Sequence, residues 1–200
     1  MRRYLALGDS YTVGEGVADD ECWPNQLVAL LRERGVEVGD AHIVARTAWT
    51  TDELSDAIDA EGPTGPFDMV TLLIGVNDQY RSRSVQSFAS EFVRLIRRAK
   101  KFAGNRASRT IVVSIPDWGS TPYAQGRDRQ LISGEIAAYN NRARELAEAA
   151  KARWVDVTEI SRAMLTEPEL VAVDGLHPTG PMYRRWAEHI LPSALAALKA

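Results

Sequence analysis

The sequence predicts an α/β fold, a three-layer α/β/α sandwich built on a five-stranded parallel sheet. Five short apolar runs along the chain are typical of strands that are buried on both faces. Between these runs lie longer segments in which apolar residues recur at helical spacing. Because parallel strands must be joined by crossover connections, this alternation favours a sheet that is covered by helices on both sides.

The predicted strands are short runs dominated by apolar residues, and the third run carries the strongest pattern. They span residues 4–7, 41–45, 69–74, 110–115 and 154–157. The alternation with helices favours the flavodoxin-like strand order 2-1-3-4-5, although other doubly wound orders share this pattern. Either order gathers the carboxyl ends of the strands at one edge of the sheet, where such folds bind their ligands.

The predicted helices are recognised by an apolar face and by signals at their ends. They cover residues 23–31, a segment beginning near residue 50, and residues 85–101, 132–150 and 179–198. Gly35 closes the first helix, and Glu53 lies in the first turn of the second, as expected after a threonine cap. Pro192 is expected to bend or break the last helix, because proline removes a backbone hydrogen bond.

Composition and charge favour a soluble globular protein that forms a single domain over residues 1–200. The chain is 45% hydrophobic and 26% charged, a balance that suits one hydrophobic core. The net charge of -3 and the pI near 5.7 give no electrostatic case for nucleic acid or an anionic membrane as a partner.

The apolar run after Arg3 is too short for a signal peptide, and no segment resembles a membrane span of about 18 apolar residues. We therefore expect a cytoplasmic protein. Cys22 is the only cysteine, so neither an internal disulfide nor a multi-cysteine metal site is expected. The sequence does not indicate an oligomeric state.

Three predicted strands are followed by residues that together suit nucleophilic catalysis. Ser10 follows the first strand and Asn77 the third, while Asp174 and His177 lie after the fifth. An aspartate at this spacing can hold one imidazole nitrogen and leave the other free as a general base for the serine. Each signal alone has a plainer interpretation as a turn or a helix cap. Their convergence on one edge of the sheet favours a catalytic site.

These residues resemble the sequence blocks of the GDSL or SGNH esterases, a family named for a serine, a glycine, an asparagine and a histidine. The matching blocks are Gly8-Asp9-Ser10-Tyr11, Gly75-Val76-Asn77-Asp78 and Asp174-Gly175-Leu176-His177, in the family's order. Tyr11 replaces the leucine of the family name and is expected only to pack. Asp9 and Asp78 are expected to stabilise turns rather than to take part in the chemistry.

The resemblance implies a serine hydrolase that acts on carboxylic esters or thioesters and needs neither a metal nor an organic cofactor. Ser10 would attack the carbonyl, with His177 as general base and Asp174 orienting the imidazole. The backbone N–H groups of Ser10 and Ala48 and the side-chain amide of Asn77 would form the oxyanion hole. Ala48 stands where the family has a glycine, and alanine suits this position provided that its φ need not be positive.

Two alternatives to hydrolysis remain open at this stage. An acyltransferase would use the same three residues with an alcohol in place of water. A non-catalytic binding module could keep the same fold, with Ala48 as the hint of a damaged oxyanion hole.

The substrate is predicted only in outline, as a small or polar ester, because the loops look short for a long-chain lipid tunnel. Trp49, Tyr80 and Trp118, together with Tyr123, lie on loops at the strand ends, where they either line the substrate pocket or pack against the fold. Trp118 and Tyr123 belong to a long polar loop, residues 117–129, which is a candidate substrate wall. Nearby arginines either meet an anionic leaving group or lie on the solvated surface; they are Arg81, Arg83, Arg127 and Arg129.

Overall fold

Five parallel strands form one sheet in the order β2-β1-β3-β4-β5 in the computed structural model, which describes residues 1–199. The strands are β1 (Arg2–Gly8), β2 (Val38–Ala45), β3 (Met69–Leu73), β4 (Thr110–Val113) and β5 (Arg153–Val155). Every neighbouring pair is parallel, so the predicted fold class and strand order are confirmed. The predicted boundaries differ by a few residues, because strands β1 and β2 begin earlier and β4 and β5 end earlier than the apolar runs.

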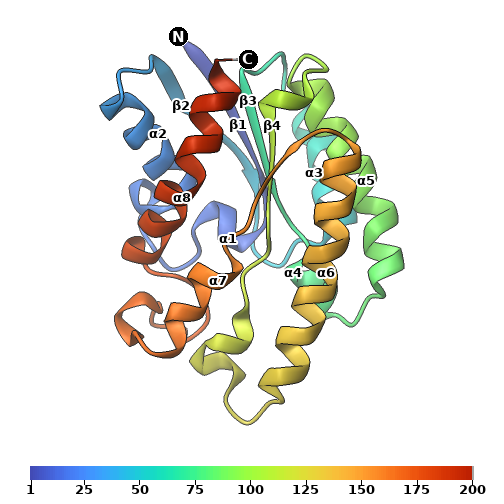
Figure 1. The fold of residues 1–200 in the computed structure, drawn as a ribbon, viewed down its shortest axis with the longest axis vertical. Coiled ribbons are helices and arrows are strands. Elements are labelled where there is room, and N and C mark those ends of the chain that lie inside the picture. Colours follow the sequence, from blue (N-terminus) through green and yellow to red (C-terminus); the bar gives the residue numbers. More distant parts are fainter. Residues whose placement is uncertain (200) are drawn as a thin grey trace.

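Helices cover both faces of the sheet (Figure 1). The long helices are α2 (Trp23–Glu33), α3 (Thr51–Glu61), α5 (Val85–Phe102), α6 (Arg129–Ala149) and α8 (Gly180–Leu198). Helices α2 and α8 pack against each other on one face, and α3, α5 and α6 lie on the other. Each long helix buries its apolar stripe; in α5 this stripe includes Phe88, Phe92 and Ile96.

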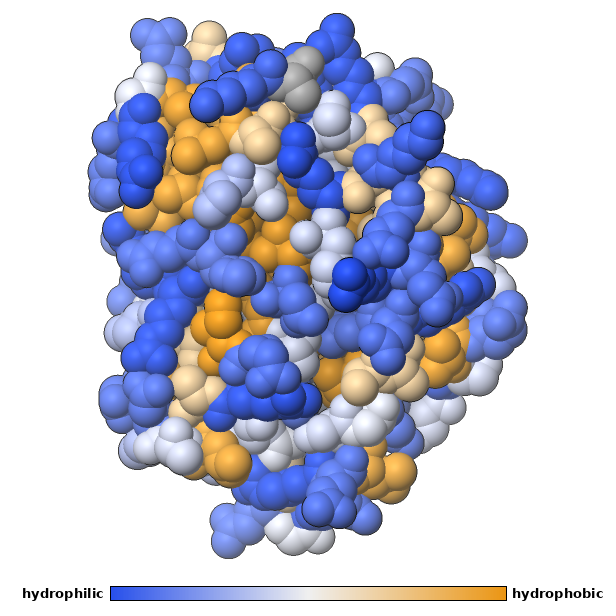
Figure 2. Space-filling view, in the orientation of Figure 1, coloured by the Kyte–Doolittle hydropathy of each residue, from blue (hydrophilic) through white to orange (hydrophobic). Residues whose placement is uncertain are grey.

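The hydrophobic core fills the space between the sheet and these helices. Leu5, Ala6 and Leu7 of the interior strand β1 have no exposed surface. Figure 2 shows hydrophilic side chains over most of one face, with apolar atoms gathered in patches between them. Among the residues that the structure describes, no helix is both long and apolar enough to cross a membrane.

Helix α8 is not broken at Pro192, a break being one of the two outcomes that the sequence predicts there. Pro192 and Glu188, the residue whose carbonyl loses its helical partner, are both exposed, so water can replace the lost hydrogen bond. On the opposite side Trp186, Ile190 and Ala194 are fully buried. Their packing holds the helix on the sheet across the proline.

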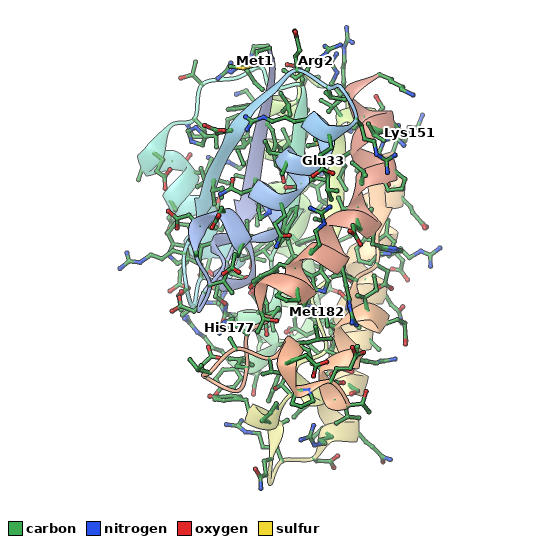
Figure 3. The ribbon with its side chains drawn as sticks, turned by 90° about the vertical axis from the view of Figure 1, so that its left-hand side faces the viewer. Met1, Arg2, Glu33, Lys151, His177 and Met182 are labelled. Atoms are coloured by element: carbon green, nitrogen blue, oxygen red, sulfur yellow. The ribbon has the colours of Figure 1, made fainter. Side chains whose placement is uncertain are left out.

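Short helices follow several strands directly. They are α1 (Ser10–Val13), α4 (Val76–Tyr80) and α7 (Thr158–Ser161). Turns of 3₁₀ helix occupy other connections: η1 (Asp19–Glu21), η2 (Ala107–Arg109), η3 (Trp118–Ser120), η4 (Pro122–Ala124), η5 (Arg162–Leu165) and η6 (Pro168–Leu170). In Figure 3 Met1 and Arg2 lie at the top, and His177 lies well below them, beyond the carboxyl edge of the parallel sheet.

Candidate active site

Strand β1 ends in a tight turn that presents Ser10 at this edge. A side chain on Gly8 would lie 2.1 Å from Thr12 Oγ1 and 2.6 Å from the carbonyl of Leu73, so only glycine fits there. Asp9 caps the short helix α1 by accepting the N–H of Tyr11 at 3.1 Å. Ser10 is the first residue of α1, and its side chain is almost fully buried.

The carboxyl of Asp9 is buried within this turn. Its Oδ2 atom has no hydrogen-bond partner among the described residues. Burial raises the pKa of Asp9 to about 8, and the hydrogen bond from Tyr11 opposes this rise only in part. At neutral pH the side chain is therefore mainly protonated, and it acts as a neutral turn residue.

His177 lies between Ser10 and Asp174, as the sequence spacing predicts. Its Nε2 atom is 3.0 Å from Ser10 Oγ, and its Nδ1 atom is 2.5 Å from Asp174 Oδ2. The other carboxylate oxygen of Asp174 accepts the N–H groups of Leu176 and His177 at 2.9 and 3.0 Å. This network favours the tautomer with a proton on Nδ1, which leaves Nε2 to accept the proton of Ser10.

The same hydrogen bonds keep Asp174 ionised. Partial burial raises the pKa of this carboxyl, but the hydrogen bonds from His177 and Leu176 outweigh burial and leave the pKa below its ordinary value. Asp174 is thus a stable counter-charge for a protonated imidazole.

Asn77 reaches the site from the start of helix α4, beyond strand β3. The turn is made by Gly75, which has a φ of 129°, and a side chain there would lie 2.6 Å from the ring of Phe88. The amide nitrogen of Asn77 donates to the carbonyl of Trp49 at 3.0 Å. Because an amide nitrogen carries two hydrogens, this bond orients the group and leaves a second donor for a ligand.

Ala48 has a φ of 70°, in the left-handed region that favours glycine. Alanine is expected to suit this position only if its φ need not be positive, and that condition is not met. Arg81 donates to the Ala48 carbonyl at 2.7 Å, and Asn77 holds the carbonyl of the next residue. Within residues 1–199 the N–H groups of Ala48 and Ser10 donate to no protein acceptor. Both donors are thus available to a ligand despite the strain.

Asp78 ties the turn after β3 to the segment that holds Ala48. It is fully buried and accepts the N–H and the hydroxyl of Thr51 at 3.0 and 2.8 Å. Arg83 approaches it at 3.3 Å and also pairs with Asp52 at 2.6 Å. Burial raises the pKa of the Asp78 carboxyl, while the bonds from Thr51 and the charge of Arg83 oppose the rise.

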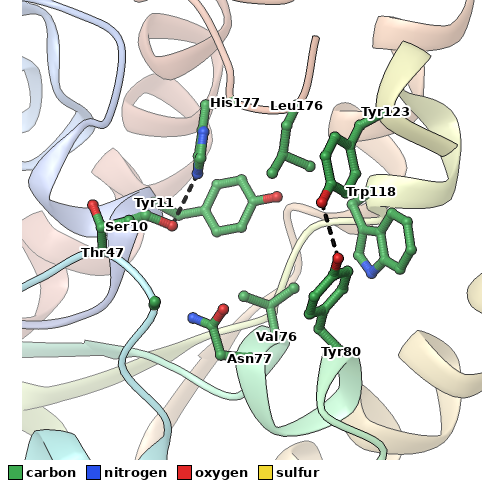
Figure 4. A pocket seen from close by; sticks show the side chains of 11 residues that line it. Ser10, Tyr11, Thr47, Val76, Asn77, Tyr80, Trp118, Tyr123, Leu176 and His177 are labelled. Atoms are coloured by element: carbon green, nitrogen blue, oxygen red, sulfur yellow. Dashed lines mark hydrogen bonds between the residues drawn. The ribbon is translucent and has the colours of Figure 1, made fainter. Parts of the chain in front are cut away.

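A pocket of about 130 Å³ lies beside Ser10 and His177 (Figure 4). It is lined by Ser10, Tyr11, Thr47, Ala48, Val76, Asn77, Tyr80, Trp118, Tyr123, Leu176 and His177. Trp49, which the sequence also places near the substrate, is not among these residues. Its half-buried side chain packs against the hydrophobic core instead, and it is its carbonyl that contacts Asn77.

Sequence reasoning missed part of this lining. Tyr11, expected only to pack, has its ring 5.2 Å from the imidazole of His177 and faces the pocket. Val76 and Leu176 also line the pocket. Each of the three is the immediate chain neighbour of a predicted site residue, and this adjacency is the signal that could have found them.

Three of the four arginines near the strand ends are held by carbonyl or carboxylate oxygens. Arg81 and Arg129 donate to backbone carbonyls, and Arg83 pairs with carboxylates. Arg127 instead stands over aromatic rings of the pocket. In the part of the chain that the structure describes, no group of three or more His, Cys, Asp or Glu side chains could hold a metal ion.

Comparisons with solved structures of other proteins find the same fold. A psychrotrophic esterase, EstA from Pseudoalteromonas sp., is 14% identical, with a TM-score of 0.77 and full coverage (100%) of both chains. A lipase/acylhydrolase from Enterococcus faecalis is 21% identical, with a TM-score of 0.69 over 96% of this chain and 94% of that chain.

An acetyl-xylooligosaccharide esterase from Geobacillus, the W190I mutant of Axe2, is 18% identical, with a TM-score of 0.73 over 96% of this chain and 94% of that chain. No curated protein sequence matches the chain. The sequence profile of the GDSL-like lipase/acylhydrolase family, in contrast, matches residues 6–185. This match spans the strand-end blocks from Ser10 to His177, and the chain therefore belongs to the GDSL-like lipase/acylhydrolase family of ester hydrolases.

Proposed function

We propose that the chain is a serine esterase in which Ser10 is the nucleophile, His177 the general base and Asp174 the orienting carboxylate. The observation that carries this proposal is the unbroken pair of hydrogen bonds from Ser10 through His177 to Asp174, at 3.0 and 2.5 Å. A serine hydroxyl is a weak nucleophile on its own, and a base at this distance activates it.

The reaction would run in two steps. His177 Nε2 takes the proton of Ser10 while Oγ bonds to the carbonyl carbon, and Nε2 then returns the proton to the leaving alcohol as its bond breaks. In the second step Nε2 takes a proton from water, whose oxygen attacks the acyl carbon. Ser10 leaves with that proton, and Asp174 stabilises the imidazolium formed in each step.

The oxyanion would be bound by the N–H groups of Ser10 and Ala48 and by the second amide hydrogen of Asn77. The support for this assignment is that the two N–H groups donate to no acceptor within the described residues, while the first amide hydrogen is held by Trp49. Donors that are fixed before the substrate arrives need no reorganisation as charge develops.

The substrate would be a small or polar ester. A pocket of about 130 Å³ is matched in size to a short acyl group, and its lining combines aromatic rings with a few polar groups. The structural similarity to an acetyl-xylooligosaccharide esterase is consistent with a short acyl group on a polar alcohol.

The Ser10→Ala variant tests this function. We expect kcat for p-nitrophenyl acetate to fall by at least about 10⁴-fold with no loss of folding. Ser87→Ala, on the exposed side of α5, is the matched control and should keep full activity. A fluorophosphonate should label the wild type and Ser87→Ala but not Ser10→Ala.

Full ester turnover by Ser10→Ala would refute the proposal. A wild-type protein that neither hydrolyses the ester nor reacts with the fluorophosphonate would be a binding module instead. Adding an alcohol acceptor to the assay distinguishes the acyltransferase, because a new ester would then form faster than the free acid.

A further inference from the structure

Tyr80 and Tyr123 meet at the side of the pocket away from Ser10 and His177 (Figure 4). Tyr80 ends helix α4 and Tyr123 belongs to η4, and their hydroxyl oxygens share a hydrogen bond at 2.9 Å. The two rings are 6.3 Å apart between centroids. They are 45% and 40% exposed, so one side of this pair faces water and the other faces the pocket.

Trp118 backs the two tyrosines and is itself held rigidly. Its ring lies 5.6 Å from that of Tyr80 and 6.0 Å from that of Tyr123, both edge-on. Its indole N–H donates to Gln79 at 2.8 Å, and Gln79 in turn donates to Glu135 on helix α6 at 2.7 Å. Trp118 is therefore a fixed support for the two partly exposed tyrosine rings.

Arg127 joins the three rings from outside. Its guanidinium carbon is 5.5 Å from the ring centres of Tyr80 and Trp118 and 5.2 Å from that of Tyr123. One of its nitrogens donates to the Tyr80 hydroxyl at 3.5 Å. The hydrogen bond and the ring contacts of the Arg127 guanidinium are thus all with this aromatic group within residues 1–199.

We propose that the Tyr80–Tyr123 contact, braced by Trp118 and Arg127, closes the acyl end of the pocket and restricts this enzyme to short acyl groups. The inference rests on the proposed esterase function. A cavity of about 150 Å³ holds one benzene molecule, so a pocket of about 130 Å³ takes acyl groups of about two to four carbons.

The side of the carbonyl that meets this wall follows from the position of His177. The leaving oxygen must stay within reach of His177 Nε2, which lies 3.0 Å from Ser10 Oγ. In Figure 4 the aromatic wall lies across the pocket from Ser10 and His177, on the far side of the Tyr11 ring. The substituent that points towards the wall is therefore the acyl chain rather than the alcohol.

Removing one ring of the tyrosine pair tests the proposal. Solvent lies on the outer side of the pair, so loss of a ring opens the pocket to a longer acyl chain. The measured quantity is the ratio of kcat/KM for p-nitrophenyl hexanoate to that for the acetate. Tyr123→Ala should raise this ratio at least about 10-fold, since each methylene accommodated in an apolar pocket is worth about that factor. Leu165→Ala removes an exposed apolar side chain outside the pocket and should leave the ratio unchanged.

Two further variants distinguish the effect of the Tyr123 ring from the effects of its hydroxyl group and of Arg127. Tyr123→Phe keeps the ring and loses the hydroxyl bond, and it should raise the ratio less than Tyr123→Ala does. Arg127→Gln removes the brace and should also raise the ratio, whereas Arg142→Gln, at a partly exposed arginine on α6, should not. If Tyr123→Ala does not fold, Arg127→Gln carries the test by itself.

Labelling with fluorophosphonates of increasing alkyl length provides a readout that does not depend on turnover. A wild type that reacts with the shortest compound, together with an unchanged ratio in Tyr123→Ala and Arg127→Gln, would overturn the proposed closure and leave the esterase intact. No reaction with any compound, and no hydrolysis, would overturn both. A series of alkyl acetates checks the orientation: if Tyr123→Ala broadens only that series, the wall faces the alcohol and the proposal is wrong.

Discussion

Ala48 has an unfavourable backbone conformation, although the proposed function needs the N–H group of this residue. A left-handed φ of 70° costs an alanine about 1–2 kcal/mol, and the contacts of Arg81 and Asn77 with the neighbouring carbonyls hold it there. Ala48 lines the pocket together with Ser10 and Asn77, and its N–H has no acceptor within the described residues. Strain at this position is therefore compatible with an intact donor.

Replacing Ala48 by glycine should stabilise the fold. Relief of the left-handed strain exceeds the extra entropy of glycine in the unfolded chain, so we expect the free energy of unfolding to rise by about 0.5–1 kcal/mol. Ala137→Gly, on the exposed side of helix α6, is the control and should lower the free energy of unfolding by about 1 kcal/mol. Urea unfolding measures both, and a loss of stability in Ala48→Gly would contradict the strain argument.

At the scale of elements, the site depends on how the short helix α4 is joined to the start of α3. Asp78 makes this joint through Thr51 and Arg83, and Asn77 adds its bond to Trp49. Two connections that follow different strands are thereby fixed relative to each other. The contacts of Asp78 and Asn77 therefore fix the positions of the proposed oxyanion donors relative to each other.

Asp78→Asn should loosen the joint without changing the shape of the side chain. It loses the charge that faces Arg83, so we expect kcat to fall about 10-fold and the free energy of unfolding to fall by about 1–3 kcal/mol. Asp59→Asn breaks an exposed pair with Arg98 between α3 and α5, away from the pocket, and should change neither quantity much. Steady-state kinetics with urea unfolding checks this, and an unchanged kcat in Asp78→Asn would show that the joint is only structural.

For the whole molecule, the buried carboxyl of Asp9 couples folding to pH. Its pKa rises from 3.8 to about 8 on folding because burial disfavours the charged form. Between these values the folded protein keeps a proton that the unfolded chain has lost. The folded state therefore binds more protons, and the free energy of unfolding falls as the pH rises from about 4 to about 8. The lowered pKa of Asp174 acts only at more acidic pH, where its stabilising effect is lost on protonation.

Asp9→Asn should flatten this dependence, because asparagine is neutral at every pH and can still accept the N–H of Tyr11. We expect the Tm of the wild type to fall between pH 5 and pH 8, and that of Asp9→Asn to change less. Asp56→Asn, an exposed position on helix α3, is the control and should follow the wild type. Calorimetry at the two pH values tests this, and equal slopes for all three proteins would rule out a proton held by Asp9.

The sequence by itself determined the layers of this protein and the edge that carries its site. Apolar periodicity records which face of each element is buried, and the parallel strands place Ser10, Asn77 and His177 at their carboxyl ends. Helices α1 and α4 escaped prediction because a single turn has no measurable period.

Only the tertiary structure decided the conformation of Ala48 and the meeting of Tyr80 with Tyr123. These two tyrosines are 43 residues apart, on connections whose sequences carry no pattern that relates them. The path of such loops depends on the elements that they join and on side chains that reach across from other loops, as Arg81 and Arg127 do. Local residue spacing determines which face of an element is buried. A contact between distant loops, in contrast, forms only once the sheet has brought the ends of those loops together.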